Sequence, residues 1–390
     1  MNELAETNLA ERVRNLPADK LDLLLRRLKP KKNSDQPSGN AGSALRPFVE
    51  ARDQNFQLTL QSPGALESLR FVAQPRRSSL LRDELEVEIE AACVNFRDVA
   101  LALGLYPTPS DGVMPKFGCD GAGRVVGVGN EVTQFKVGDE VFFLSGDSTF
   151  AKYARVPEMG AFRKPAQWTW EEAAGLALTF ITVFYSLRVP GRLAKGERIL
   201  IHCAAGGIGL AAIQLARMTG AEVFATSGTE EKRHYLRSLG IGQVMDSRSL
   251  EFADQILAAT HGEGIDVVLN SIAGGAIEAG IRLLRNDGRF LEIGKRDLVP
   301  GRVLDLAHFS RSITFAAIDI FAGTFERLHP TVLEIRQAIA DGSLQALPAK
   351  VFKVSEIIDA FRHMTVGKHI GRIAVQMKGE PIYLSTATAR

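Results

Sequence analysis

From residue 171 onward the chain alternates between apolar strands and helical segments, and this pattern restricts the fold more than any other feature. A helix is predicted over 171–187. The strands predicted after it have helices between them and lie at 198–202, 222–226, 243–247, 265–271 and 289–294. Such alternation is typical of a parallel, doubly wound sheet with right-handed crossovers. We therefore expect an α/β fold for this part of the chain.

A glycine-rich turn follows the first of these strands and reads A-A-G-G-I-G. Compared with the pattern G-x-G-x-x-G, Ala204 replaces the first glycine, whereas Gly206 and Gly209 keep their places. Gly206 lets the backbone approach a pyrophosphate, and Gly209 lets the helix pack close to the strand. Because a strand precedes the turn and a helix follows it, we predict a dinucleotide site. Its contacts are expected from Ala205, Gly206, Gly207, Ile208 and Gly209.

The tip of the next strand predicts which dinucleotide is bound. It reads Ala-Thr-Ser-Gly and lacks the acidic residue that would hold an adenosine ribose diol and repel a 2′-phosphate. Ser227 offers a hydroxyl, and Lys232 and Arg233 follow in the next helix, although two glutamates nearby dilute their positive field. We therefore predict NADPH rather than NADH. The alternative for Lys232 is a solvated helix face.

The pattern changes along the chain in a way that indicates two domains and a terminal extension. Short strands between turn clusters precede the alternating region, and a strand–helix–strand pattern follows it. We expect the nucleotide-binding module to be inserted in a β-rich domain. The predicted segments are an N-terminal helix and flexible linker (1–45), the first part of the β-rich domain (46–165), the nucleotide-binding domain (166–325), the return to the β-rich domain (326–378) and a C-terminal tail (379–390).

Composition excludes several other classes of protein. The formal charge is +2 and the basic residues are spread along the chain, which argues against nucleic acid as a partner. Three cysteines without paired spacing indicate a reducing compartment. The sequence lacks an apolar run of about 18 residues. We expect a cytoplasmic protein without a membrane anchor.

Five stretches carry a family resemblance, at 94–107, 118–129, 183–216, 264–275 and 288–298. Through them the chain resembles the medium-chain dehydrogenase/reductase superfamily, and within it the enoyl reductase domains of modular polyketide synthases and related fatty acid synthases. The resemblance implies a GroES-like catalytic domain, a Rossmann domain, and an active site in the cleft between them. It also implies NADPH-dependent reduction of an α,β-unsaturated thioester on the phosphopantetheine arm of an acyl carrier protein, with other synthase domains as partners. The superfamily includes dimers and monomers, so a homodimer stays open.

The same resemblance implies the catalytic residues. Hydride addition to the β-carbon leaves an enolate, which needs hydrogen-bond donors for its oxygen and a proton for its α-carbon. Tyr106 matches the family's proposed proton donor, and Lys295 with Asp319 matches a family lysine–aspartate pair. A packing role for the tyrosine and an exposed turn position for the lysine are the alternatives. Cys119 and Asp120 stand where zinc enzymes of the superfamily have His and Glu, so we expect no metal.

Four further residues are expected at the nicotinamide end of the cofactor. Asn95 matches a family residue near the nicotinamide ribose and substrate, with a turn-forming role as the alternative. Asn270 and Ser271 follow a strand, and Thr182 lies in the helix that approaches the cleft. These positions complete the predicted site.

Several functional alternatives stay open at this stage. The chain is either a discrete reductase acting in trans or a domain of a megasynthase. A free-standing quinone or enal reductase would act without a carrier protein. Some family relatives instead use hydride addition to expel a leaving group and close a cyclopropane ring. A cofactor-binding protein without turnover is a fourth reading, against which the intact set of Tyr106, Lys295 and Asp319 argues.

Overall fold

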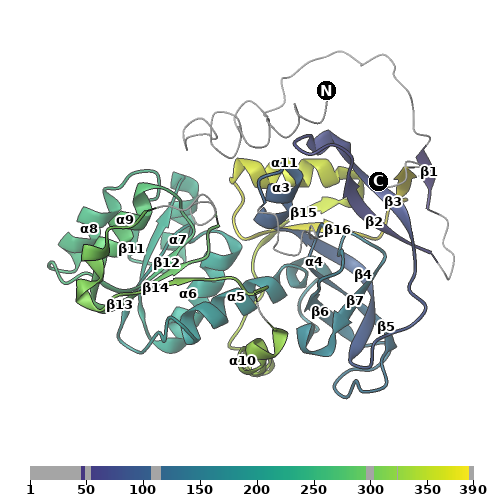
Figure 1. Cartoon of the computed structure of the whole chain (residues 1–390), viewed down its shortest axis with the longest axis horizontal. Helices are drawn as coiled ribbons and strands as arrows, with labels where there is room; N and C mark the ends of the chain where they lie inside the picture. Colours follow the sequence, from purple (N-terminus) through teal and green to yellow (C-terminus); the bar gives the residue numbers. More distant parts are fainter. Residues whose placement is uncertain (1–44, 49–53, 107–115, 296–302, 323, 386–390) are drawn as a thin grey trace, which may run out of the picture. The chain divides into compact units, whose positions relative to one another are not determined.

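The computed structural model describes residues 45–48, 54–106, 116–295, 303–322 and 324–385, so the predicted N-terminal helix and most of its linker lie outside the described residues. The chain forms two compact units (Figure 1). One runs to Gly175 and continues with Lys350–His369 and the chain from Ile373. The other contains Leu176–Ala349 and Ile370–Arg372. The α/β unit is thus inserted in the chain of the β-rich unit, as the predicted fold class requires.

The inserted unit is built on a six-stranded parallel sheet in the order β11-β10-β9-β12-β13-β14. Its strands are β9 (Arg198–Ile201), β10 (Glu222–Ser227), β11 (Gln243–Asp246), β12 (Ile265–Asn270), β13 (Leu284–Glu292) and β14 (Thr314–Ala317). The strand order reverses between β9 and β12, and open parallel sheets bind ligands beside the carboxyl ends of strands at such a point.

Helices cover both faces of this sheet (Figure 1). They are α5 (Leu176–Arg188), α6 (Gly207–Thr219), α7 (Glu230–Ser238), α8 (Phe252–Ala259), α9 (Gly275–Leu283) and α10 (His329–Ala340), with 3₁₀ turns η3 (Leu306–Arg311) and η4 (Phe325–Leu328). Because both faces are covered, the strands are near-continuous apolar runs, as in β9, where Ile199, Leu200 and Ile201 are fully buried.

The single helix predicted over 171–187 is interrupted. The structure has α4 (Trp170–Ala173) and then α5, with a turn at Ala174 and Gly175. Thr169 caps α4 by accepting a hydrogen bond from the Glu172 amide. The interruption coincides with the boundary between the two units.

The β-rich unit contains two sheets. The larger has the order β15-β16-β4-β5-β6-β8, with β7 also paired to β4, and the smaller has the order β1-β17-β3-β2. Their strands are β1 (Leu45–Pro47), β2 (Gln54–Leu60), β3 (Leu69–Pro75), β4 (Glu84–Val94), β5 (Asp120–Val128), β6 (Glu140–Leu144), β7 (Tyr153–Pro157), β8 (Ala161–Arg163), β15 (Ala349–Lys353), β16 (Arg372–Gln376) and β17 (Tyr383–Ser385).

Helices α3 (Phe96–Ala102) and α11 (Ile357–Val366) pack together in this unit, and 3₁₀ turns form at Leu66–Ser68, Glu158–Gly160 and Val354–Glu356. The predicted C-terminal tail differs from the structure, because β17 pairs with β1 and β3 and the preceding Ile382 joins the core. No helix of the described residues is long and apolar enough to cross a membrane.

Candidate functional site

The glycine-rich turn connects β9 to α6 as predicted. A Cβ atom on Gly209 would lie 2.4 Å from the Ala204 Cα, so the helix packs against the turn at a distance that only glycine allows. The Ala204 amide donates to the Thr226 carbonyl (2.9 Å), which joins the turn to β10. Ala205 is fully buried, and Gly206 is the residue that precedes the helix. The predicted close packing at Gly209 is confirmed.

An arginine that the sequence patterns do not single out lies beside this turn. The Gly371 amide donates to the Ala205 carbonyl (2.8 Å), which brings the next residue, Arg372, against the start of α6. A Cβ atom on Gly207 would lie 2.2 Å from the Arg372 Cδ and 3.1 Å from its Nη1. Arg372 is 8% exposed, and Ile208 beside it is half-buried. A cation and a helix N-terminus therefore converge where the pyrophosphate is predicted to bind.

The tip of β10 carries a second group of cations. The Arg248 side chain lies over Gly228, with its Nε 3.1 Å from where a Cβ atom on that glycine would be. Burial lowers the pKa of Lys232, and the neighbouring Arg248 cation lowers it further. Two cations near one exposed strand end suit a phosphate dianion. Ser227 itself is only 2% exposed, so its side chain is largely covered.

Arg233 is placed differently from the other predicted phosphate ligands. Its guanidinium lies 2.8 Å from Glu230, 3.0 Å from Asp246, and 3.0 Å from the Ser227 carbonyl that accepts its hydrogen bond. Two carboxylates thus balance its charge. Arg248, which was not among the predicted ligands, offers more charge to a phosphate. A signal was available, since Arg248 follows β11, and adjacent parallel strands end at the same edge.

Lys295 and Asp319 lie beyond the ends of two adjacent strands, β13 and β14. The Lys295 Nζ donates to the Asp319 Oδ2 over 2.5 Å, and the two side chains are 35% and 38% exposed. Asp319 was expected within an apolar strand, but β14 ends at Ala317 and the carboxylate remains partly solvated. The Phe321 amide donates to its other oxygen (3.0 Å). The pair is therefore accessible and held in a defined orientation.

Buried polar contacts fix the backbone that leads to Lys295. The Asn270 Nδ2 donates to the Glu292 carboxylate (2.5 Å) and to the Ile272 carbonyl (2.8 Å). The Glu292 carboxylate also accepts from the Gly294 amide (2.6 Å). Asn270 is fully buried and its side chain braces the ends of β12 and β13, with Ser271 half-buried after it. These bonds restrict the turn on which Lys295 stands.

Asp319 is anchored from a second direction by Arg327 in η4. The Arg327 Nη2 donates to the Asp319 carbonyl (2.5 Å), and its Nη1 donates to the Tyr185 hydroxyl (2.7 Å). Tyr185 belongs to α5, one turn after the half-buried Thr182. The residue predicted on that helix thus lies near the Arg327–Tyr185 link rather than in it.

In the β-rich unit the predicted residues cluster around α3. Asn95 precedes the helix, is 4% exposed, and donates from its Nδ2 to the Asp120 carboxylate (2.6 Å). The Asp98 carboxylate accepts from the Asn95 amide (2.8 Å) and the Gly118 amide (2.8 Å). Asn95 therefore has a defined structural role, and its contact with the cofactor stays a prediction. Tyr106 is half-buried at the end of this segment.

The described residues do not offer a set of zinc ligands. No group of three or more His, Cys, Asp or Glu side chains in this part of the chain has a geometry for a metal ion. Asp120 is occupied by Asn95, and Cys119 is buried beside that contact, with its Sγ 3.7 Å from the Asn95 Nδ2. These residues do not fit zinc, so no step is derived through a metal.

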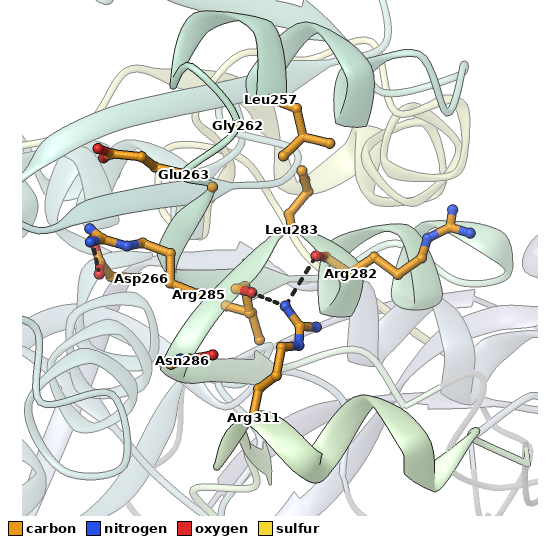
Figure 2. A pocket seen from close by; sticks show the side chains of 11 residues that line it. Leu257, Gly262, Glu263, Asp266, Arg282, Leu283, Arg285, Asn286 and Arg311 are labelled. Carbon is orange, nitrogen blue, oxygen red and sulfur yellow. Dashed lines mark hydrogen bonds and ion pairs between the residues drawn. The ribbon is translucent and has the colours of Figure 1, made fainter.

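Figure 2 shows a cavity of about 520 Å³ in the α/β unit. It is lined by residues that precede or begin β12 and β13, including Glu263, Asp266 and Arg285. Arg311 reaches across it and donates to the carbonyls of Arg282 (3.5 Å) and Leu284. The cavity lies at the amino ends of the strands, opposite the glycine-rich turn, and its arginine caps the end of α9. We assign it no coenzyme role.

Comparisons with known proteins match both parts of the chain. The family model described as zinc-binding dehydrogenase matches residues 207–334, and the alcohol dehydrogenase GroES-like domain matches residues 82–166. A phenolphthiocerol/phthiocerol polyketide synthase from Mycobacterium tuberculosis (strain ATCC 25618 / H37Rv) is 39% identical over 326 residues. That match covers 82% of this chain but only 15% of the synthase polypeptide, so the chain corresponds to a small part of it.

Two solved structures are similar over nearly their whole length. The CurK enoyl reductase has a TM-score of 0.75 and 38% identity, and the match covers 83% of this chain and 99% of that one. The CurF ER cyclopropanase from the curacin A biosynthetic pathway has a TM-score of 0.74 and 35% identity, with coverage of 83% and 99%.

Proposed function

Because this chain belongs to the polyketide synthase enoyl reductases of the medium-chain dehydrogenase/reductase superfamily, we propose that it reduces 2-enoyl thioesters with NADPH. It is an oxidoreductase. The observation that carries the proposal is the Lys295–Asp319 pair, 2.5 Å apart beyond the ends of β13 and β14. This is the edge of a parallel sheet at which nucleotide-binding folds place their reacting groups.

The residues of the chain supply what the reaction needs from the protein. When bound, NADPH supplies a hydride to the β-carbon of the substrate. Lys295 donates a hydrogen bond to the thioester oxygen on which negative charge develops, and Asp319 keeps its ammonium oriented. Tyr106 gives its proton to the α-carbon, which restores the thioester carbonyl. The assignment of roles to these residues follows the family resemblance.

Coenzyme selection is proposed to depend on two separate cationic positions. Arg372 and the start of α6 bind the pyrophosphate, which NADH and NADPH share. Lys232 and Arg248 bind the 2′-phosphate, which only NADPH has. The absence of a carboxylate at the end of β10 supports the same choice.

The substrate is proposed to arrive on a phosphopantetheine arm of an acyl carrier protein, with other polyketide synthase domains as partners. The support is that the M. tuberculosis relative is a polyketide synthase of which this chain matches about one seventh, 15% of its length. A second candidate function is favoured by the 35% identity to the CurF cyclopropanase. In that reaction the enolate carbon displaces a leaving group and closes a three-membered ring.

The test offers the purified protein three substrates with NADPH, and with NADH in parallel: a 2-enoyl pantetheine thioester, its analogue with a γ-halogen, and a simple quinone. NADPH consumption is followed by absorbance and products by mass spectrometry. We expect saturation of the enoyl thioester, with halide retained in the halogenated product. A cyclopropane product would establish the second function, and turnover of the quinone with both thioesters inert would refute the proposal.

A further inference from the structure

A largely buried arginine lies beside Tyr106. Arg97 belongs to the first turn of α3, and its side chain is 16% exposed. The amides of Leu105 and Tyr106 both donate to the Ala100 carbonyl (2.8 and 3.1 Å), which folds the chain back after the helix. The Arg97 Cζ consequently lies 5.9 Å from the centre of the Tyr106 ring. Burying a guanidinium is costly, so its position needs an explanation.

The carboxylate of Asp98 accounts for only part of this explanation. Its Oδ1 lies 3.7 Å from the Arg97 Nη1, but its two oxygens already accept from the Asn95 and Gly118 amides. Asp98 is therefore held by the main chain independently of Arg97. The guanidinium has a further neighbour in the Tyr106 phenol.

The electrostatic surroundings keep Arg97 charged. Burial by itself lowers the pKa of its guanidinium, but Cys119, Asp98 and Tyr106, the last also through a hydrogen bond, together raise that pKa above its usual value. A permanent cation in a poorly solvated place interacts strongly with any charge that appears beside it.

We propose that Arg97 is a positioning residue that acts through Tyr106, orienting its phenol and stabilising the phenolate formed during the reaction. The inference rests on the proposed function. In the protonation step the electron pair of the enolate forms the new C–H bond at the α-carbon while the Tyr106 O–H bond breaks. The thioester carbonyl is restored, and the phenolate next to Arg97 later takes a proton from water. Arg97 thus lowers the cost of a charge that exists only after proton transfer.

A double-mutant cycle tests this coupling. The wild type, Arg97→Met, Tyr106→Phe and the double variant are compared with a 2-methyl-2-enoyl pantetheine thioester, in H₂O and in D₂O. We expect each single variant to lose at least about tenfold in kcat, to show a larger solvent isotope effect, and to scramble the α-carbon configuration. The double variant should be no slower than Tyr106→Phe, because Arg97 has no phenol left to act on.

Controls separate this role from a structural one. Arg97→Lys keeps the charge and should recover part of the rate, while Arg163→Met, which removes an exposed arginine paired with Asp139, should leave all readouts unchanged. Multiplicative losses in the double variant, or an unchanged solvent isotope effect in Arg97→Met, would overturn the inference alone. A wild type without activity towards any enoyl thioester would overturn both the proposed function and this inference.

Discussion

The side chain of Arg372 lies against Gly207, so closely that a Cβ atom on the glycine would come within 2.2 Å of the arginine Cδ. The two residues are far apart in the sequence and are brought together by the hydrogen bond from the Gly371 amide to the Ala205 carbonyl. Glycine at 207 leaves room for the arginine at the start of α6. This contact places a buried cation where an anionic coenzyme is proposed to bind.

We therefore expect Arg372→Leu to weaken NADH and NADPH binding alike. Losing a charged hydrogen bond to the pyrophosphate should cost about 1.5–3 kcal/mol, or roughly tenfold to a hundredfold in Kd. Gly207→Ala should show a smaller loss of the same kind, because its methyl group displaces the arginine. Calorimetric titration with both coenzymes measures this, and unchanged affinities in Arg372→Leu would contradict it.

Replacing Arg248 or Lys232 with alanine should instead change the preference between coenzymes. We expect the Kd for NADPH to rise by about tenfold or more, with the Kd for NADH unchanged, because only NADPH carries the 2′-phosphate. Arg237→Ala is the matched control, since Arg237 lies on the same helix as Lys232 and pairs with Glu230. Equal losses for both coenzymes in Arg248→Ala would show that this cation serves another part of the ligand.

Lys295→Met should abolish most of the activity with an enoyl thioester while leaving coenzyme affinity unchanged. Removing a donor to the developing oxyanion typically lowers kcat by about 100-fold to 1,000-fold. Asp319→Asn should have a smaller effect, because the ammonium remains. The control is Lys353→Met, which breaks a comparable ion pair with Glu380 at 2.9 Å. Steady-state kinetics of all three variants makes the comparison, and a fully active Lys295→Met would remove the lysine from the mechanism.

How much of this could be predicted from the sequence depended on whether the signal was local. The contact between Gly209 and Ala204 was predictable, because both residues belong to one strand–turn–helix unit with a known geometry. Arg372 was missed since its approach to the turn depends on a chain return that no local pattern reveals. Asn270 was expected beside the cofactor, but its amide is used by Glu292, a partner on the neighbouring strand.

Arg233 and Arg248 illustrate the same limit in the opposite direction. Arg233 follows the strand tip directly and was selected for that reason, yet Glu230 and Asp246 balance its charge. Arg248 follows the adjacent strand and reaches Gly228 through the parallel pairing of β10 and β11. Charge type was predictable from sequence, but the distribution of partners required the sheet.

His202 gives a prediction for the pH dependence of stability. It is 3% exposed, its Nδ1 lies 2.8 Å from the Thr226 hydroxyl oxygen, and its ring meets Phe252 edge to face at 5.0 Å. Burial lowers its pKa from 6.5 to about 3. Between these values the unfolded chain binds a proton that the folded protein does not, so acidification from 6.5 towards 3 destabilises the fold.

The expected size of the effect allows a direct measurement. At about pH 5 this single group should reduce the free energy of unfolding by about 2 kcal/mol relative to about pH 7. Urea unfolding of wild type and His202→Gln at both pH values should show a shallower pH dependence in the variant, whereas His234→Gln, which removes an exposed histidine of α7, should keep the wild-type slope. Identical slopes for wild type and His202→Gln would mean that His202 is protonated in the folded protein. The hydrogen bond to Thr226, which holds the turn against β10, would then have to form with a charged imidazole as the donor.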